Sequence, residues 1–278
     1  MSAERPARRG RRGTAAVAVR LLPPSAVLAA VIGLWYAVSY VLLSPDRRFL
    51  VPPPHAVLAV GFLDSTNRGE LLAGLGVSAR VASLGLLVAT AIGVLTAVVM
   101  NLGRWVERSL FPYFVVLQVT PILALVPLFG FWFGYGLATR VLVCVLISLF
   151  PIVANTLFGL RSVDEAHHDL FSLGRAGRAA RLWKLELPSA LPALFTGLRI
   201  SAGLSVVGAI VGDFFFRQGE PGMGILIDLY RARLQSEQLF AAVLLSSAFG
   251  LAVFLCFGAL ARAVVGGWHE SARPGLDR

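Results

Sequence analysis

Long runs without a charged side chain constrain this sequence more than any other feature. A helix that crosses the hydrocarbon core of a bilayer needs about 20 consecutive, mainly apolar residues. Five uninterrupted runs reach that length, and a sixth contains a single arginine, Arg199. In chain order the six runs cover residues 21–45, 81–103, 109–139, 141–160, 187–212 and 239–261. The sequence therefore predicts an all-α integral membrane protein with six transmembrane helices.

The composition agrees with a membrane location. Hydrophobic residues make up 57% of the chain and charged residues 14%, whereas soluble domains average about 45–50% apolar and about 25% charged residues. Strands of a membrane β-barrel would alternate apolar and polar residues in segments of about 10, and stretches such as VLVCVLISLF do not alternate. No internal repeat divides residues 21–268, so we expect one transmembrane domain over this range.

The basic residues predict the orientation of the chain. Lys and Arg accumulate in cytoplasmic loops, and six spans with a cytoplasmic N-terminus place 16 of the 25 on the inner side, 8 on the outer side and Arg199 within the membrane. Both termini are therefore expected in the cytoplasm, as tails at residues 1–20 and 269–278. This topology explains the net charge of +10, so we expect membrane lipid and no nucleic acid among the partners.

Side chains suited to catalysis or metal binding are few. The only lysine, Lys184, follows Trp183 and so cannot belong to a P-loop, which requires Gly-Lys-Ser or Gly-Lys-Thr. His167 and His168 are adjacent and would point about 100° apart on a helix, so they cannot share one metal ion. We therefore expect no enzyme activity, no metal site and no cofactor in this chain.

The stretch SVDEAHHDLFSLGRAGRAARLWKLELPSALP, residues 162–192, is exceptional because it carries eight charged side chains. Asp164 and Glu165 would occupy the first turn of a helix, where negative charge suits the helix dipole. Gly174 is expected to turn the backbone through a positive φ angle, so the stretch predicts two short helices beneath the membrane. Four apolar residues share one helical face, which suits either the lipid surface or a partner protein. These residues are Val163, Ala166, Leu170 and Leu173.

The same stretch resembles a motif of the integral membrane subunits of ATP-binding-cassette (ABC) importers. That motif reads Glu-Ala-Ala, three residues, Gly, nine residues, an aliphatic residue, one residue and Leu-Pro. HDLFSLG and LELPSALP stand in its place here, with His168 and Asp169 at the positions of Glu and the first Ala. The gap from Gly174 to Pro188 is one residue longer than in the motif.

The resemblance extends over residues 51–268 and points to the permeases for nitrate, sulfonate, taurine and related compounds. VPPPHAVL is similar to the segment after their first span, SARVASLGLLVATAIG to their second span, and TPILALVPLFGFWFGYGLATRV to their third span and turn. FPIVANTLFGLRSVD and LPSALPALFTGLRISAG resemble the fourth and fifth spans, and GDFFFRQGEPGMGILI the outer loop, with Asp213 where Glu is usual. The resemblance implies the type I ABC importer (MetI-like) permease fold.

The resemblance also assigns a role to residues 161–188. In this family the corresponding cytoplasmic loop forms a coupling helix that docks on a cytoplasmic ABC ATPase dimer, which binds the ATP. The solute reaches the permease from an extracytoplasmic solute-binding protein. Carried onto this sequence, the coupling residues are Asp164, Glu165, Ala166, His168, Asp169, Leu170, Leu173, Gly174, Leu187 and Pro188.

Polar residues within the spans are candidates for the translocation path, because their burial in lipid is costly. Each could instead form a hydrogen bond between helices, and Arg199 could anchor its helix at the inner surface. One chain supplies half of a type I importer path, so we expect a second permease copy, most simply in a two-fold homodimer. The path candidates are Gln118, Thr120, Asn155 and Arg199.

A stand-alone secondary transporter or channel is the alternative function. The scarcity of carboxylates within the spans and the absence of repeated halves argue against it. The expected function is therefore that of the permease subunit of an ATP-driven importer. Its expected cargo is a small solute, either nitrate-, sulfonate- or taurine-like or a precursor of a pyrimidine or a flavin.

Overall fold

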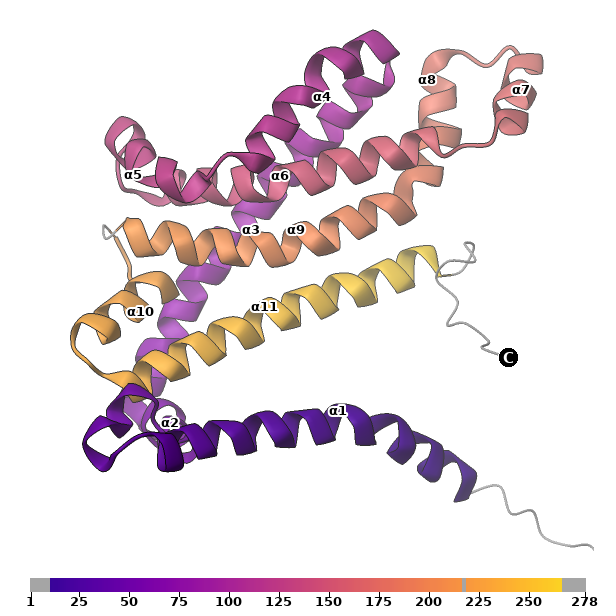
Figure 1. Ribbon diagram of the computed structural model, residues 1–278. Helices are drawn as coiled ribbons and strands as arrows, with labels where there is room; N and C mark the ends of the chain where they lie inside the picture. Colours follow the sequence, from indigo (N-terminus) through magenta and orange to yellow (C-terminus); the bar gives the residue numbers. More distant parts are fainter. Residues whose placement is uncertain (1–10, 217–218, 267–278) are drawn as a thin grey trace, which may run out of the picture.

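The computed structural model describes residues 11–216 and 219–266, and every regular element in these ranges is helical (Figure 1). The predicted tail residues 1–10 and 269–278 therefore lie outside the described part, and α1 begins within the predicted N-terminal tail. The long helices are α1 (Arg11–Ala37), α3 (Ser65–Asn101), α4 (Arg104–Val119), α5 (Ile122–Phe133), α6 (Leu137–Arg161), α9 (Leu187–Phe215) and α11 (Ser236–Val265). The short ones are α2 (Pro54–Leu58), α7 (Glu165–Leu173), α8 (Arg178–Arg181) and α10 (Met223–Ala232).

Three π-helical turns and one 3₁₀ helix adjoin these elements. The π turns are Val38–Leu42 after α1, Ala59–Leu63 after α2 and Leu182–Glu186 between α8 and α9, and the 3₁₀ helix is Pro45–Leu50. A π turn holds one residue more per hydrogen-bonded turn than an α-helix. The π turn Leu182–Glu186 makes α8 and α9 continuous, and together they form one apolar segment, Arg178–Phe215.

The described part contains five helical segments long and apolar enough to cross a membrane, and the bent pair α4–α5 makes a sixth if it counts as one span. This result agrees with the six predicted transmembrane helices. The five unbroken segments are Leu22–Leu42, Ser65–Asn101, Leu137–Arg161, Arg178–Phe215 and Ser236–Val265.

The second span begins earlier than the charge-free run suggested. Helix α3 starts at Ser65 rather than near Val81, and the side chain of Asp64 caps it by accepting a hydrogen bond of 2.9 Å from the amide of Asn67. An aspartate at this position satisfies a backbone donor that has no partner within the helix. The charged residues between Ser65 and Val81 therefore lie on the same helix as the charge-free run.

The third span is broken between α4 and α5, whose axes differ in direction by 97°. Thr120 and Pro121 separate the two helices, and Pro121 cannot donate a backbone hydrogen bond. The hydroxyl of Thr120 donates to the carbonyl of Val116 at 2.7 Å. Proline commonly kinks a helix, and the change of direction here is much larger than a kink. Helix α5 ends at Gly134, whose φ of +81° makes the predicted turn into α6.

Helices α6 and α9 run side by side through the middle of the molecule, with α3 crossing behind them (Figure 1). Small residues allow this close approach. A Cβ atom on Gly159 would lie 2.8 Å from the Cα atom of Ala190, and one on Gly208 would lie 2.9 Å from the Cα atom of Cys144. Small residues at membrane helix interfaces let backbones pack closely, which stabilises the pair by van der Waals contact. Helix α11 lies beside α9, and α1 lies outermost.

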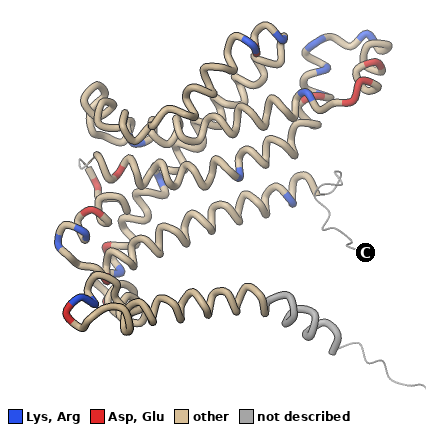
Figure 2. Tube along the Cα trace, viewed as in Figure 1, with Lys and Arg blue, Asp and Glu red and all other residues tan. Residues whose placement is uncertain are grey.

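Charged side chains gather at the two ends of the helices, and the middle is nearly free of them (Figure 2). One end carries α7, α8 and the start of α4, and the other carries α2 and α10. We call them the α7 end and the α10 end. This distribution is the one that a bilayer imposes, because charges are costly at its centre.

A buried polar cluster fixes the α10 end. Arg140 of α6 forms an ion pair of 2.8 Å with Asp213 of α9, and their side chains are 4% and 0% exposed. The other oxygen of Asp213 accepts a hydrogen bond of 2.6 Å from Ser78 of α3, and Ser78 in turn accepts one from the amide of Met223 at 2.8 Å. Arg140 also donates to the carbonyl of Glu220 at 3.2 Å. Three spans and the segment leading into α10 are thereby joined, in a region that the sequence predicted only as a loop.

Candidate functional site

Helix α7 projects beyond the ends of α6 and α9, where the chain leaves one span and returns to the next (Figure 1). Helix α6 ends at Arg161 and α9 begins at Leu187, which are close to the limits of the predicted loop 161–188. The carbonyl of Asp164 accepts hydrogen bonds from the amides of His167 and His168 at 3.1 and 3.3 Å and so starts α7. Two short helices, α7 and α8, fill the loop as the sequence predicted.

The apolar residues predicted to share one helical face of this loop differ in exposure in the structure. Leu170 and Leu173 are 63% and 83% exposed, whereas Val163 and Phe171 are partly buried and Ala166 is exposed. Exposed leucines that lie together on one short helix are characteristic of an interaction surface. We call Leu170 and Leu173 the leucine pair.

The turn after α7 differs from the one expected. Gly174 has a φ of −72°, and the residue with positive φ is Arg175, at +49°. A Cβ atom on Gly174 would make only ordinary contacts, the nearest being 3.6 Å from the carbonyl oxygen of Leu170. The prediction that Gly174 adopts positive φ is therefore wrong, because the backbone reverses one residue later. The carbonyl of Phe171 in α7 accepts a hydrogen bond of 2.9 Å from the amide of Ala176, and this bond stabilises the turn.

The loop is tied to the turn between α3 and α4 by side chains of α8 and the π turn. Arg178 donates to the carbonyl of Leu102, and Asn101 donates to the carboxylate of Glu186 at 2.6 Å. A hydrogen bond to an ionised group is stronger than one between neutral groups. The loop is therefore connected to the end of α3 as well as to α9.

Two further contacts hold the loop together. Arg181 of α8 donates to the hydroxyl of Ser172 in α7 at 3.0 Å, which connects the two short helices. Arg161, the last residue of α6, pairs with Glu107 of α4 and also donates to the carbonyl of Met100 at 3.3 Å. The base of the loop is thus joined to both neighbouring helices by arginine side chains.

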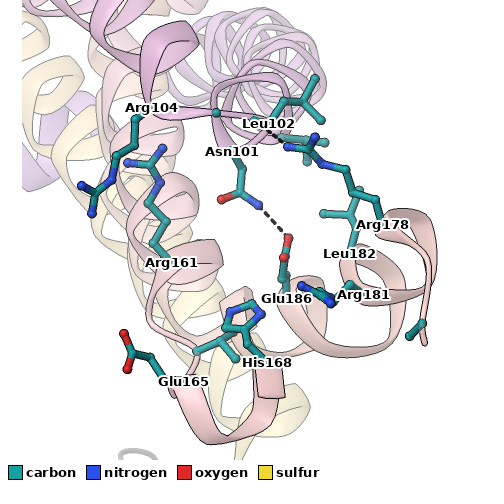
Figure 3. A pocket seen from close by; sticks show the side chains of 14 residues that line it. Asn101, Leu102, Arg104, Arg161, Glu165, His168, Arg178, Arg181, Leu182 and Glu186 are labelled. Carbon is teal, nitrogen blue, oxygen red and sulfur yellow. Dashed lines mark hydrogen bonds between the residues drawn. The ribbon is translucent and has the colours of Figure 1, made fainter. Parts of the chain in front are cut away.

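A cavity of about 760 Å³ lies between the loop and the α3–α4 turn. Figure 3 shows four arginines around it, together with Glu165, His168 and Glu186. Glu165 and His168, two of the predicted coupling residues, therefore line the inner side of the loop. The leucine pair does not line this cavity and is exposed to solvent. The arginines are Arg104, Arg161, Arg178 and Arg181.

The remaining coupling residues lie along the same segment. Asp164 and Asp169 are exposed, and Leu187 and Pro188 form the first turn of α9. A proline at the start of a helix costs no hydrogen bond, because the first amides have no partner within the helix. The structure therefore brings the predicted coupling residues into one loop, with its two ends fixed by α6 and α9.

The four path candidates lie at separate places in one copy. Gln118 is exposed on α4, and Thr120 lies at the break before α5. Asn155 lies where α6 meets α9, and its amide donates to the carbonyl of Pro151 at 2.8 Å. Arg199 lies between α9 and α11, where its guanidinium stacks on a ring at 4.0 Å from the centroid. One copy therefore does not gather them around a common channel.

Sequence reasoning missed the buried ion pair of Arg140 and Asp213. Arg140 interrupts two charge-free runs, 109–139 and 141–160, and counts among the eight basic residues expected on the outer side, yet it lies near the start of α6 and is buried. The available signal was an arginine next to one apolar run and an aspartate at the end of another, because charges at membrane depth pair with each other. Between residues 11–216 and 219–266, no three His, Cys, Asp or Glu side chains come together as a metal site.

The site is thus a loop that is connected to three neighbouring spans. It consists of an exposed leucine pair on α7, a basic cavity behind it, and hydrogen bonds to the ends of α3, α4 and α9. Such an arrangement suits the docking of another protein, because apolar anchors surrounded by charge give both affinity and specificity.

Comparison with known proteins identifies relatives that cover most of the chain. The sequence profile of the family described as "Binding-protein-dependent transport system inner membrane component" matches residues 89–266. A probable ABC transporter permease protein of Haemophilus influenzae is 32% identical over 236 residues, which are 85% of this chain and 94% of the relative. The formylaminopyrimidine transport permease protein ThiX of Halalkalibacterium halodurans is 34% identical over 172 residues, 62% of this chain and 68% of the relative. The taurine transport system permease protein TauC of Escherichia coli is 29% identical over 252 residues, 87% of this chain and 88% of the relative.

These relatives are transport permeases and not enzymes, and the several apolar helices agree with a multi-pass inner membrane protein. Permeases of this family work with an ATPase and a solute-binding protein. Membership of the family therefore argues against a stand-alone transporter or channel. The chain belongs to the family of binding-protein-dependent transport system inner membrane components, the permease subunits of ABC importers.

Proposed function

We propose that this permease imports a small solute, and that α7 is the coupling helix on which a cytoplasmic ABC ATPase docks. The observation that carries the proposal is the exposure of the leucine pair at the tip of a loop that is otherwise tied to the membrane helices. Burial of two exposed leucines in a groove would stabilise a complex by about 1.5–3 kcal/mol for each side chain. The α7 end is cytoplasmic in this proposal, as are both termini.

The ATPase would bind and hydrolyse ATP, and this chain would hold no cofactor of its own. Closure of two ATPase subunits would push the loop, and the contacts of Arg178 with Leu102 and of Asn101 with Glu186 would carry the displacement to α3. Because Leu187–Phe215 continues directly from the loop through the π turn, α9 would move with it. These contacts support rigid-body movement of the span helices, since interfaces switch between packed arrangements rather than deform continuously.

The break between α4 and α5 supports the placement of the path. Backbone that is not helical is tolerated at membrane depth only where it is covered by protein or lines an aqueous cavity. Residues on both sides of the break are exposed in one copy, among them Val119 at 74% and Phe131 at 80%. A second, identical copy related by a two-fold axis would cover this surface and place Gln118 and Thr120 of both copies beside the path.

The cargo would arrive from an extracytoplasmic solute-binding protein, which would do most of the selection. Relatives named for formylaminopyrimidine and for riboflavin are 34% and 35% identical, whereas those named for taurine and sulfonates are 27–29% identical. These values favour a precursor of a pyrimidine or a flavin over a nitrate-, sulfonate- or taurine-like solute. Binding assays on the partner binding protein with both classes would decide between them.

The test of the coupling helix is the double variant Leu170→Asp with Leu173→Asp. We expect it to enter the membrane at the normal level and to lose the ATPase on co-purification, because two charges would replace the apolar anchors. The matched control is Leu63→Asp with Leu234→Asp, which changes two leucines that are 76% and 71% exposed outside the loop. Retention of a stoichiometric ATPase by the α7 double variant would disprove the docking role.

The test of the homodimer uses two copies of this chain that carry different affinity tags. We expect each tag to recover the other from detergent, together with two ATPase subunits. Recovery of one tag alone, with a related permease in the same complex, would show a heterodimer instead.

A further inference from the structure

A second cavity, of about 490 Å³, lies between α9 and α11. It contains two arginines, Arg199 from α9 and Arg262 from α11, and neither takes part in the loop contacts described above. We call it the α9–α11 groove. The other α9 residues that line it share one face of the helix with Arg199. They are Pro192, Phe195 and Thr196.

The guanidinium of Arg199 is held in a fixed place within the groove. Its central carbon lies 4.0 Å from the centroid of the Phe254 ring. On α11, a Cβ atom added to Gly258 would lie 3.2 Å from that same carbon, so the guanidinium rests close to the backbone at a position without a side chain. Stacking on an aromatic ring favours a cation and orients its plane. The arginine is therefore positioned before any ligand binds.

The groove carries two positive charges and no compensating acid among the described residues that line it. The Nε atom of Arg199 is buried and has no hydrogen-bond partner among the described residues. Arg262 uses its Nε atom to donate to the carbonyl of Gly258 at 3.3 Å, and the hydroxyl of Thr196 donates to the carbonyl of Pro192 at 3.0 Å. No carboxylate is among the described residues that line the groove. Two guanidinium groups that face an acid-free cavity favour an anion, most strongly an oxyanion that can accept from both.

The position of the groove indicates the source of the anion. Arg262 lies in the last turn of α11, at the α7 end, and Arg199 lies within the apolar segment Arg178–Phe215. Only 17% of the apolar window of α11 is buried, so the groove opens on a lateral surface of this copy rather than into its core. Its rim is apolar and includes Leu255 and Val265. A basic pocket between membrane helices near the cytoplasmic surface matches the depth of lipid phosphates.

We propose that the α9–α11 groove binds the phosphate of an acidic phospholipid from the cytoplasmic leaflet, with Arg199 and Arg262 as its ligands. The inference rests on the proposed orientation, in which the α7 end is cytoplasmic. A lipid with a net negative headgroup is preferred over a zwitterionic one, because a choline group would bring a third cation beside two arginines. In this proposal Arg199 binds a lipid and does not line the translocation path.

The test is native mass spectrometry of the permease purified with its ATPase, titrated with phosphatidylglycerol and with phosphatidylcholine of the same acyl chains. We expect phosphatidylglycerol to bind roughly tenfold more tightly, and Arg199→Gln and Arg262→Gln each to weaken it by roughly tenfold. Gly258→Leu keeps both charges but fills the groove, so it should abolish the same binding. The matched control is Arg108→Gln, an exposed arginine of α4 outside the groove, which should change the affinity by less than about twofold.

Three results would overturn the proposal. Equal affinity for the two lipids would remove the preference for an acidic headgroup. Equal effects of Arg199→Gln and Arg108→Gln would mean that lipid follows overall charge rather than this groove. Displacement of phosphatidylglycerol by inorganic phosphate or by the imported solute would mean that the site takes a free anion. The same spectra count the ATPase, so loss of lipid with the ATPase retained tests the groove separately from the role of α7.

Discussion

Arg140 and Asp213 are separated by 73 residues in the sequence, yet they form an ion pair of 2.8 Å that is almost completely buried. The pair joins α6 to α9 at the α10 end, opposite α7 and α8. Asp213 also accepts a hydrogen bond from Ser78 of α3, so that three spans meet at one carboxylate. Because the partners satisfy each other, the cost of burying either charge alone is avoided.

We expect Asp213→Asn and Arg140→Gln each to destabilise the protein strongly, by about 3–5 kcal/mol, because each leaves one buried charge without its partner. The double variant should be more stable than the sum of the single effects predicts, since it removes both charges. Thermal unfolding in detergent measures all four proteins. Additive effects would show that the two residues act independently and that the ion pair contributes nothing of its own.

A second prediction concerns the contact between α10 and α9. A Cβ atom on Gly224 would lie 2.1 Å from the carbonyl oxygen of Ile210. Gly224→Ala should therefore displace α10 and cost roughly 1–3 kcal/mol, as overpacking does elsewhere. The matched control is Gly203→Ala, where a Cβ atom would meet nothing within 4 Å. In a helix this control should stabilise the protein by about 0.5–1 kcal/mol, and equal melting temperatures for the two variants would contradict the prediction.

A third prediction follows from the turn after α7. Arg175→Gly should stabilise the loop by up to about 1 kcal/mol, because Arg175 has positive φ, which costs a residue with a side chain. Gly174→Ala should leave ATPase binding and transport nearly unchanged, since the φ of Gly174 is −72°. Thermal unfolding checks Arg175→Gly, and transport and ATP hydrolysis in proteoliposomes check Gly174→Ala. A severe loss with Gly174→Ala alone would mean that the loop has a different backbone when the ATPase is bound.

The fourth prediction concerns pH and Tyr230 of α10. Burial raises the pKa of Tyr230 to about 12, and the hydrogen bond and negative charge of Glu70 add to the shift. The phenol donates to the carboxylate of Glu70 at 3.0 Å, a bond that the phenolate cannot make. A pKa raised by folding means that the stabilisation is complete below about pH 10, the value of an unperturbed tyrosine. The stabilisation is then lost as the pH rises toward 12.

Tyr230→Phe tests this relationship. The variant should be less stable than the wild type at neutral pH, because Glu70 loses its donor, and the difference should shrink between about pH 10 and 12. Thermal unfolding of both proteins across that range measures the difference and cancels the titration of other groups. A difference that stays constant up to pH 12 would exclude a titrating bond to Glu70.

The sequence predicted the helical spans well because a bilayer imposes one strong requirement, an apolar run of sufficient length. It placed the start of α3 too late, since Arg68, Glu70 and Arg80 interrupt the apolar pattern although they lie on the same helix. Helix α10 was predicted as loop because its segment is short and flanked by charges. The position of α10 depends on the contacts of Asp213 and Arg140. These contacts join residues that are far apart in the sequence, so no local sequence pattern predicts them.

The candidate site was predictable in part. The spacing of apolar residues located α7, and the exposure of Leu170 and Leu173 agrees with a docking surface. The spacing did not reveal which residue would turn the chain, because Gly174 and Arg175 differ in φ through the hydrogen bonds of the folded loop. Nor could it reveal the bond between Asn101 and Glu186, which are 85 residues apart.

The π turn Leu182–Glu186 gives a reason for the extra residue between Gly174 and Pro188. The importer motif has one residue fewer in this interval, and a π turn holds one residue more than an α turn. A π turn accommodates the extra residue, so the chain is longer while α8 and α9 remain one continuous helical segment. Removing Lys184 should therefore convert the segment to ordinary α-helix and restore the interval that the motif has between its glycine and its proline.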